Sequence, residues 1–521
     1  MKNNASTRQN LSYTETAHLF QVARETVTNW VKEGYLETDG QNRITHQSIL
    51  RFQLKYAGKI KLHARANKLH KEGIDIVEVN SLVLAELQKE TFDNSIGDRY
   101  GQMLSESYRN KEGIFYTPMY IVDDMMKDVR ADADTLFLDP CCGTGNFLVK
   151  AIEKGVSPQN LYGFDTDPTA ILIARRRIKE LTGQEAPHVV CSDFLKECPE
   201  LGVTFDLVYT NPPWGKKILK TERDRLAKRY QTGSSTDTCS LFLFASMSVL
   251  KPDGLMGLLM PESFFNIATY ENARKSVLEQ TLLSVDDYGK PFGNMYSACA
   301  IVVLNRTTDG ANEVICNDGQ HVFKRLQKSF LAMPKHILNY WTNDVEMAYI
   351  EQLMRQPYLT LKDHAQWGLG IVTGNNTELC KPNRRKGYKP VYRGSDIFPD
   401  RIKEASLFLR PKDFSRYQQM ASVKLLNAPV KLIYRFISNN LVFFCDAEQR
   451  FILNSANMLV LDEDFPLSSE ELAEIMNRPL TNWIFKQLFH THKVLRSDLE
   501  ALPIITDLSL HRSFNFSNLK G

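Results

Sequence analysis

The chain has 521 residues, and its composition is 43% hydrophobic and 24% charged, with a formal net charge of +3 at pH 7. This length exceeds what a single hydrophobic core serves, and this balance excludes wholesale disorder, so several folded domains are expected. The mildly basic total permits a nucleic-acid partner without indicating one, because a DNA-binding face depends on local clusters of Lys and Arg.

The cysteines and the apolar runs bear on the cellular compartment. The nine cysteines contain no Cys-x-x-Cys pair, and Cys141 and Cys142 are adjacent, a spacing that suits neither a zinc site nor an ordinary disulfide. The first residues are polar, and no apolar run is long enough to span a bilayer. We therefore expect a cytoplasmic protein that holds no metal and does not contact a membrane.

Residues 1–56 are predicted to form a small winged helix-turn-helix-like domain. Residues 13–20 and 24–31 have the caps and the apolar spacing of two short helices, and a turn follows them. The pattern resembles modules of the MerR or excisionase type, whose second helix enters the major groove of DNA. The resemblance puts Val27 and Trp30 inside and assigns three residues to DNA contacts: Arg24, Thr28 and Asn29. A docking or dimerisation module is the alternative.

The rest of the chain divides into regions that differ in their pattern of apolar and charged residues. Residues 57–112 are predicted to be a helical linker, whose basic stretch 59–70 is either a solvated helix face or a contact for DNA phosphates. From residue 113, short apolar runs alternate with helical patterns, which indicates βαβ units. The seven expected strands are 135–138, 161–164, 189–191, 206–210, 255–260, 282–287 and 300–304. Beyond about 330 the pattern becomes irregular, as in a separate domain.

A glycine-rich segment follows the first expected strand. It reads Asp139-Pro140-Cys141-Cys142-Gly143-Thr144-Gly145-Asn146-Phe147. The two glycines allow a sharp turn ahead of a helix whose first N–H groups are unpaired. The segment lacks the Gly-Lys-Ser/Thr of a nucleotide phosphate loop and the spacing of the dinucleotide fingerprint. These departures favour a ligand that has a carboxylate and no phosphate.

Acidic residues stand at the ends of the next two expected strands. Asp165 ends the second strand and can accept both hydroxyls of a ribose. Asp193 follows the third strand and can accept an adenine amino group beside the ring of Phe194. Each could instead be a strand-end cap or a core aromatic. In series they favour a nucleoside site, because ligands of open α/β sheets bind where the carboxyl ends of the strands converge.

The fourth expected strand ends in the sharpest signal of the sequence. The tetrapeptide reads Asn211-Pro212-Pro213-Trp214. Consecutive prolines fix the backbone and remove its donors, so that the carbonyl groups of the turn project as acceptors. If the side-chain oxygen of Asn211 and the backbone oxygen of Pro212 accept the two N–H bonds of an exocyclic amine, its nitrogen becomes a better nucleophile. Trp214 can stack on a base rotated out of a duplex.

In this order the motifs resemble the gamma class of N6-adenine DNA methyltransferases, the TaqI-like family, strongly over 113–305 and loosely over 360–505. The resemblance implies S-adenosyl-L-methionine (SAM) as the cofactor. Its methionine end is assigned to a Tyr-Thr-Pro turn and the glycine-rich segment, its ribose to Asp165, and its adenine to Asp193 and Phe194. The cofactor residues so implied are Tyr116, Thr117, Asp139, Pro140, Cys141, Gly143, Gly145, Asn146, Phe147, Asp165, Asp193 and Phe194.

The same resemblance implies the catalytic and DNA-contacting residues. The catalytic turn is Asn211, Pro212, Pro213 and Trp214. The resemblance assigns Trp214 and Phe292 to the flipped target adenine. At the position of Trp214 the family more often has Tyr or Phe. Arg393 and Arg435 lie in segments similar to those of the TaqI-like specificity domain, and we expect them at DNA.

The expected fold is α/β, with a seven-stranded Rossmann-like SAM-dependent methyltransferase sheet. A small N-terminal helical helix-turn-helix domain and a C-terminal α+β target-recognition domain are expected beside it. The expected boundaries are 1–56 for the helix-turn-helix domain, 57–112 for the linker, 113–330 for the catalytic domain and 331–521 for the recognition domain.

The expected activity is site-specific methylation of adenine N6 in double-stranded DNA, by the modification enzyme of a restriction–modification system or by a solitary methylase. Two alternatives stay open. One is SAM-dependent methylation of RNA or of a protein amide, and the other is a DNA-binding regulator with a vestigial methyltransferase fold. No nuclease signature is evident in the sequence. The expected partner is double-stranded DNA, and a restriction endonuclease is expected to be a separate chain or absent. We expect a monomer.

Overall fold

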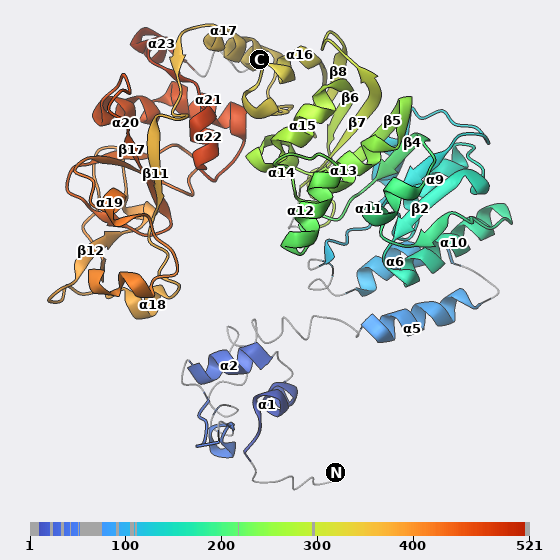
Figure 1. Ribbon diagram of the computed structural model, residues 1–521, viewed down its shortest axis with the longest axis horizontal. Helices are drawn as coiled ribbons and strands as arrows, with labels where there is room; N and C mark the ends of the chain where they lie inside the picture. Colours follow the sequence, from blue (N-terminus) through green and yellow to red (C-terminus); the bar gives the residue numbers. More distant parts are fainter. Residues whose placement is uncertain are drawn as a thin grey trace. The chain divides into compact units, whose positions relative to one another are not determined.

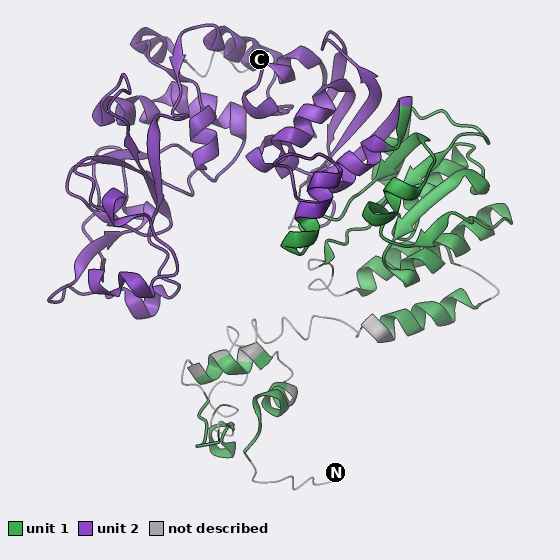
Figure 2. Cartoon of the chain, viewed as in Figure 1, with its two compact units in different colours: residues 1–223, 249–251 green, residues 224–248, 252–521 purple. Residues whose placement is uncertain are grey.

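The computed structural model describes residues 10–20, 24–32, 36–41, 43–49, 52, 76–89, 93–104, 109, 112–216, 218–293 and 297–515. The chain forms two compact units (Figure 2). Unit 1 consists of Met1–Arg223 and Val249–Lys251, and unit 2 consists of Asp224–Ser248 and Pro252–Gly521. Within the described residues, no helix is both long and apolar enough to cross a membrane.

Two short helices, α1 (Tyr13–Phe20) and α2 (Arg24–Lys32), begin the described part of unit 1. Their buried core is Ala17, Val27, Trp30, Leu36, Ile44, Ile49 and Phe52. The prediction that Val27 and Trp30 point inward is therefore confirmed. Arg24 is exposed, and the Thr28 hydroxyl donates a hydrogen bond to the Arg24 carbonyl at 3.0 Å. The side chain of Asn29 and the basic stretch 59–70 lie outside the described residues.

Four parallel strands form the centre of unit 1, in the order β3-β2-β1-β4. They are β1 (Phe137–Asp139), β2 (Leu161–Asp165), β3 (Val189–Cys191) and β4 (Phe205–Thr210). The first four predicted strands are thus confirmed. Helices α9 (Asn146–Glu153) and α10 (Pro168–Thr182) contact the strands (Figure 1). The remaining short elements are α8 (Met119–Met125), η1 (Pro158–Asn160), α11 (Phe194–Glu197) and η2 (Cys198–Glu200).

Two helices from the region predicted as a linker pack against α10. They are α5 (Ile76–Leu87) and α6 (Ile96–Met103). Their shared apolar cluster consists of Val79, Val83, Ile96, Tyr100, Leu104, Ala170 and Ile173. This packing ties α6 to the part of unit 1 that follows β2.

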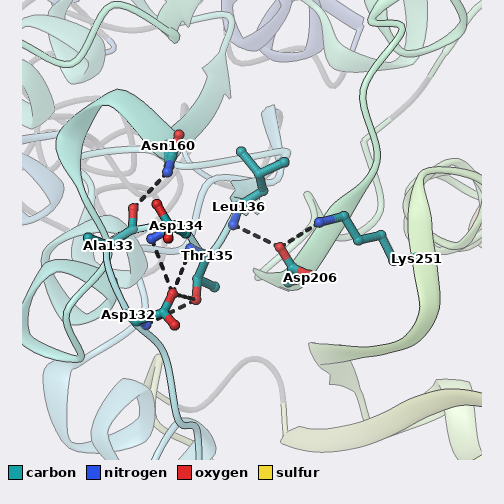
Figure 3. Close-up of polar contacts among 8 residues, drawn as sticks. All are labelled: Asp132, Ala133, Asp134, Thr135, Leu136, Asn160, Asp206 and Lys251. Atoms are coloured by element: carbon teal, nitrogen blue, oxygen red, sulfur yellow. Dashed lines mark hydrogen bonds and ion pairs between the residues drawn. The ribbon is translucent and has the colours of Figure 1, made fainter.

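The amino edge of the unit 1 strands is held by polar contacts (Figure 3). The Asp206 carboxylate accepts hydrogen bonds from the Leu136 backbone N–H at 2.9 Å and from Lys251 Nζ at 2.8 Å. The Asp132 carboxylate accepts from the Thr135 hydroxyl at 2.8 Å, and Asn160 Nδ2 donates to the Ala133 carbonyl at 2.7 Å. The carboxyl edge of the same strands carries the chemistry described below.

The sheet continues beyond β4 in the order β3-β2-β1-β4-β5-β7-β6-β8-β9, so it has nine strands and the prediction of seven was too low. The β5–β7, β6–β7 and β8–β9 pairs are antiparallel, and the β6–β8 pair is parallel. The strands after β4 are β5 (Leu250–Pro261), β6 (Gln280–Asp287), β7 (Ala298–Thr307), β8 (Glu313–Asn317) and β9 (Val322–Leu326). The β8–β9 hairpin is the part that the sequence analysis missed. Its strands are short and partly exposed, with Val322 70% exposed, so they form no continuous apolar run.

The other helices up to residue 354 are α12 (Lys220–Arg229), α13 (Thr238–Ser248), α14 (Ser263–Asn266), η3 (Ala268–Tyr270), α15 (Glu271–Leu278), α16 (Gln327–Leu331), η4 (Pro334–His336) and α17 (Asp344–Met354). The α17 helix begins with a capping box, in which the Asn343 side chain accepts from Glu346 N and the Glu346 side chain accepts from Asn343 N.

The remainder of unit 2 combines small sheets with helices. One sheet has the order β11-β17-β14-β15, a second β13-β12-β16, and a third β10-β18. The strands are β10 (Tyr358–Leu359), β11 (Ala365–Leu369), β12 (Lys389–Tyr392), β13 (Leu407–Leu409), β14 (Lys431–Arg435), β15 (Phe443–Asp446), β16 (Phe451–Ile452), β17 (Ala456–Leu461) and β18 (Ile504–Ile505). The helices are α18 (Asn376–Leu379), η5 (Gly394–Asp396), η6 (Pro411–Arg416), α19 (Val423–Leu426), α20 (Ser469–Asn477), α21 (Pro479–Phe489), α22 (Arg496–Ala501) and α23 (Leu508–Ser513).

Candidate functional site

Two carboxyl groups lie at adjacent strand ends of unit 1. Asp139 ends β1, is 1% exposed, and accepts a hydrogen bond from the Cys141 backbone N–H at 3.1 Å. Asp165 ends β2 and accepts from the backbone N–H groups of Gly143, at 2.9 Å, and Asp167, at 2.8 Å. Burial raises the pKa of Asp139 to about 7 and that of Asp165 to about 6. The edge therefore holds two acids whose ionised forms favour a cationic or hydrogen-bond-donating ligand.

The glycine-rich segment turns sharply between β1 and α9. Gly143 has φ +50° and Gly145 has φ +88°, both in the left-handed region that glycine adopts most easily. The Cys142 N–H donates to the Phe164 carbonyl at 2.8 Å, which fixes the turn against β2. Pro140 and Phe147 are buried, and Cys141 is half-buried. The backbone of this turn, more than its side chains, is thus what faces the strand ends.

Tyr116 is held between two glycines. A Cβ atom on Gly143 would lie 2.6 Å from Cε1 of the Tyr116 ring, and one on Gly101 would lie 2.6 Å from Cδ2. Since real Cβ atoms do not approach so closely, neither position admits a side chain while the ring stays in place. Thr117 is 6% exposed, and its carbonyl accepts from Asn146 Nδ2 at 2.7 Å. The predicted Tyr-Thr-Pro turn and the predicted glycine turn therefore pack against each other.

A buried arginine that the sequence analysis did not single out connects these parts. Arg177, on α10, is 5% exposed, and its Nη1 donates to the Thr144 carbonyl at 2.7 Å and to Asn146 Oδ1 at 2.6 Å. Its Nε donates to Asn94 Oδ1 at 2.7 Å. Burial lowers the pKa of this guanidinium. Both polar atoms of the Asn146 amide thus make a hydrogen bond within the protein, so Asn146 helps to hold the turn, and its predicted contact with a cofactor stays a prediction.

A second contact from α6 reaches the end of β2. The Tyr100 hydroxyl lies 2.6 Å from Asp167 Oδ2 and 3.2 Å from Asn80 Oδ1. Asp167 also caps α10, because its Oδ1 accepts from the Thr169 N–H at 2.9 Å. The signal that could have identified Arg177 is its helical spacing from Ala170, Ile173 and Ala174, which puts a charge on the buried face.

Asp193 and Phe194 have local structural partners. Asp193 Oδ1 caps α11 by accepting from the Leu195 N–H at 3.2 Å, and Oδ2 forms an ion pair with Lys196 at 3.1 Å. Phe194 is 1% exposed, and its ring centroid lies 5.4 Å from that of Phe164. The structure thus shows a helix cap and a core aromatic, and the predicted contact of this pair with a cofactor adenine stays a prediction.

The Asn211 turn presents an acceptor without a partner among the residues that the structure describes. Asn211 Nδ2 donates to the Phe115 carbonyl at 2.7 Å, and this donor role fixes which end of the amide is which. Oδ1 is buried and accepts no hydrogen bond from any described residue. Trp214 is 2% exposed, with its ring centroid 5.8 Å from that of Phe115. The turn is therefore anchored to the segment before β1, while one buried carbonyl oxygen is left to accept from something else.

The remaining predicted residues belong to unit 2. Phe292 is half-buried in the turn between β6 and β7. Arg435 Nε donates to the Ile397 carbonyl at 2.9 Å, and Arg393 is exposed at the start of the same loop. The sequence separates these two arginines by more than forty residues, and the structure brings both to the loop that holds Ile397. No group of His, Cys, Asp and Glu within the described ranges could hold a metal ion.

Two family models match the chain. N-6 DNA Methylase matches residues 92–346, and the TaqI-like C-terminal specificity domain matches residues 389–504. Type II methyltransferase M.VspI from Vibrio sp. (strain 343) is 40% identical over 390 residues, which are 74% of this chain and 96% of that protein. Modification methylase CviBIII from Paramecium bursaria Chlorella virus NC1A is 24% identical over 40% of this chain and 54% of that protein.

Solved structures share the fold. A chain of the DrdV–DNA complex has a TM-score of 0.54 at 13% identity, over 96% of this chain and 65% of that chain, so this chain spans somewhat less than two thirds of it. The Type IIL restriction-modification enzyme MmeI, solved in complex with DNA, has a TM-score of 0.51 at 11% identity, over 94% of this chain and 84% of that chain.

Proposed function

Because the chain belongs to the N-6 DNA methylase family, we propose that it is a site-specific methyltransferase acting on the N6 amino group of an adenine in duplex DNA. S-adenosyl-L-methionine is the methyl donor. The observation that carries the proposal is the buried Oδ1 of Asn211, which is fixed in place through Nδ2 and has no donor of its own among the described residues. An acceptor so placed is suited to an amino group supplied by the substrate.

The strand ends of unit 1 fit the cofactor. SAM carries a positive sulfonium and a positive ammonium group, and the edge offers the carboxyls of Asp139 and Asp165. Each Asp165 oxygen already accepts one backbone N–H and has a second lone pair for a ribose hydroxyl. At Gly143 the Tyr116 ring packs so closely on the backbone that no Cβ fits, which holds the ring against the glycine turn. When bound, SAM supplies an electrophilic methyl group attached to sulfur.

Asn211 and Pro212 act on the acceptor in this proposal. The adenine amino nitrogen is a poor nucleophile because its lone pair is delocalised into the ring. Asn211 Oδ1 and the Pro212 carbonyl each accept one of its N–H bonds, which draws the nitrogen toward tetrahedral geometry and localises the lone pair. Pro212 and Pro213 fix the backbone so that these acceptors need no reorganisation. The amino nitrogen gains the methyl group and loses one of the two protons that Asn211 Oδ1 and the Pro212 carbonyl hold, and this proton passes to water.

The target base must leave the duplex to reach a site of this kind. Trp214 packs against Phe115 in the structure, so its first role here is to hold the turn. We assign to Trp214 a contact with the extruded adenine, and the second contact predicted for Phe292 stays a prediction. For Trp214, stacking requires that a face of its buried ring become accessible when DNA binds.

The C-terminal match supports DNA as the acceptor. A TaqI-like specificity domain over residues 389–504 suits DNA as the substrate and disfavours an RNA or protein-amide acceptor. The anchored Asn211 turn and the carboxyl edge disfavour a regulator with a vestigial fold. We place the catalytic domain at 113–330 and the recognition domain at 331–521, in a monomer that modifies DNA within a restriction–modification system, with any endonuclease as a separate chain.

Replacing Asn211 tests the proposal directly. Asn211→Ala is expected to lower the single-turnover rate of methyl transfer about 10²- to 10³-fold, the range seen when one preorganised polar group is removed from a transition state. SAM affinity, measured by calorimetric titration, is expected to change less than twofold. Asn160→Ala is the matched control, because Asn160 also donates its amide to a backbone carbonyl but at the opposite edge of the strands. Weakened SAM binding with an unchanged single-turnover rate would contradict the assignment.

We also propose that the region around α1 and α2 is a helix-turn-helix module that adds DNA affinity without choosing the sequence. Deleting residues 1–56 is expected to weaken binding to duplex DNA about tenfold while leaving the methylated motif unchanged. The affinity is measured by fluorescence anisotropy and the motif by sequencing modified bases. A changed motif would show that this region reads bases, and an unchanged affinity would favour the docking alternative.

A further inference from the structure

One aromatic ring in unit 2 is surrounded by positive charges. Phe398 lies in the loop between η5 and β13, and three cationic groups stand over its ring. The distances to the ring centroid are 4.8 Å for Arg401 Cζ, 5.3 Å for Lys403 Nζ and 5.0 Å for Arg435 Cζ. We call Phe398, Arg401, Lys403 and Arg435 the Phe398 cluster.

The loop that carries the cluster is held in one conformation. Phe398 N–H donates to the Arg401 carbonyl at 2.8 Å, and Lys403 N–H donates to the Asp396 carbonyl at 2.8 Å. Gly394 N–H donates to Ser455 Oγ at 2.9 Å, and a Cβ on Gly394 would lie 2.3 Å from the Ser455 carbonyl oxygen. Together with the bond from Arg435 Nε to Ile397, these contacts fix the ring and its cations before any ligand arrives.

The charges of the cluster act together. All three cations lie within 5.3 Å of one centroid, so no two are farther apart than twice that distance, which is about one Debye length at 0.1 M salt. Within the described parts of the chain, Lys403 and Arg435 form no ion pair. Arg401 pairs with Asp400 at 2.9 Å, but both side chains are more than 60% exposed, and such surface pairs exchange readily. The cluster therefore attracts an anion more strongly than any single cation would.

We infer that the Phe398 cluster is a clamp for the phosphate backbone of the DNA duplex. This inference rests on the proposed function, and every residue of the cluster lies inside the 389–504 match to a specificity domain. Arg435 has its Nε engaged by Ile397, so it cannot present the Nε edge of its fork to a base. A lysine and two arginines gathered at one ring attract a ligand by their combined positive charge. They do not present the directed set of hydrogen-bond donors that recognises a particular base. Phosphates, which position the protein without carrying sequence, are recognised by charge of this kind.

The test measures how DNA binding depends on salt, using the full chain, a duplex that contains its methylation motif, and no methyl donor. For Arg401→Ala and Lys403→Ala, the slope of log affinity against log salt is expected to fall by about 0.9 for each phosphate that the variant no longer neutralises. The methylated motif is expected to stay the same. Phe398→Leu keeps every charge and is expected to weaken binding by freeing the cations. Lys362→Ala, at an exposed lysine elsewhere in unit 2, is the control that should leave the slope unchanged.

Three outcomes overturn the inference. If the wild-type chain methylates DNA but the slope is the same in Arg401→Ala and Lys403→Ala, the cluster does not touch phosphates. If the control variant lowers the slope as much, the effect belongs to total charge. If the motif changes, the cluster reads bases. A wild-type chain that binds and methylates no DNA refutes the proposed function itself, which is a separate result.

Discussion

Unit 1 and unit 2 both present charged side chains where a ligand is proposed to bind, but they hold them in different surroundings. At the strand ends of unit 1, Asp139 is 1% exposed and Arg177 is 5% exposed, and both are hydrogen-bonded inside the protein. In the Phe398 cluster, the Arg401 side chain is 63% exposed. Buried charges are little screened by salt, whereas exposed charges are screened within about 10 Å at 0.1 M. The cofactor edge should therefore respond to packing and pH, and the cluster to salt.

The largest effect expected at the cofactor edge comes from Gly143→Ala. The new Cβ would meet the Tyr116 ring, which cannot retreat because Gly101 packs on its other side. SAM affinity, measured by calorimetric titration, is expected to fall about 100-fold. Gly183→Ala is the control, because Gly183 also has a positive φ of +71° but no atom within 4 Å of the added Cβ. It should cost about 1 kcal/mol of stability through backbone strain and leave SAM affinity unchanged.

If Gly143→Ala binds SAM as well as the wild-type chain, the contact between Tyr116 and Gly143 does not shape the cofactor site.

Arg177 comes next in expected size. Arg177→Ala leaves the Thr144 carbonyl, Asn146 Oδ1 and Asn94 Oδ1 without their donor, and it is expected to cost about 3 kcal/mol in the free energy of unfolding. As a positioning residue, it should raise the KM for SAM about tenfold while kcat at saturating SAM changes little. Arg177→Lys, which keeps the charge but not the fork, should recover part of the affinity.

Lys179→Ala serves as the control on the same helix, since the Lys179 side chain is 53% exposed and should contribute little. A loss of kcat in Arg177→Ala at saturating SAM, with KM unchanged, would show that Arg177 does not act through the cofactor turn.

The smallest effect expected at this edge is on pH dependence. Burial raises the pKa of Asp165 to about 6, so a ligand that binds the ionised carboxyl should bind about fourfold more weakly at pH 5.5 than at pH 8. The sign for the empty protein is opposite. Because the folded pKa lies above the unfolded value of about 3.9, this group's contribution to stability is lost as pH rises from about 4 to about 6.

Calorimetric titration of SAM across this pH range checks the binding effect, and thermal unfolding of the empty protein checks the stability effect. Asp165→Asn should flatten the Asp165 contribution to both. A SAM affinity that rises toward low pH would contradict the role of the ionised carboxyl.

The sequence could predict the residues that lie in local motifs but not those that meet through packing. Asp139 and Asp165 each end a short strand, and Asn211 directly follows one. Because parallel strands deliver their carboxyl ends to one edge, local motifs were enough to group these three residues. Arg177 and Tyr100 lie on helices and reach the site only through packing, so no motif marked them. In unit 2, Phe398 lies in a loop and Arg435 on β14, and the two meet only in the folded chain, which spacing alone cannot reveal. The β8–β9 hairpin was missed because its exposed faces lack an apolar pattern.

The measurement that tests the central claim most directly is a map of modified bases in DNA from cells that express the chain, beside cells that express Asn211→Ala. We predict N6-methyladenine at one short motif in the first DNA and none at that motif in the second. Methylation of another base, or an unchanged adenine map with Asn211→Ala, would contradict the role assigned to the Asn211 turn.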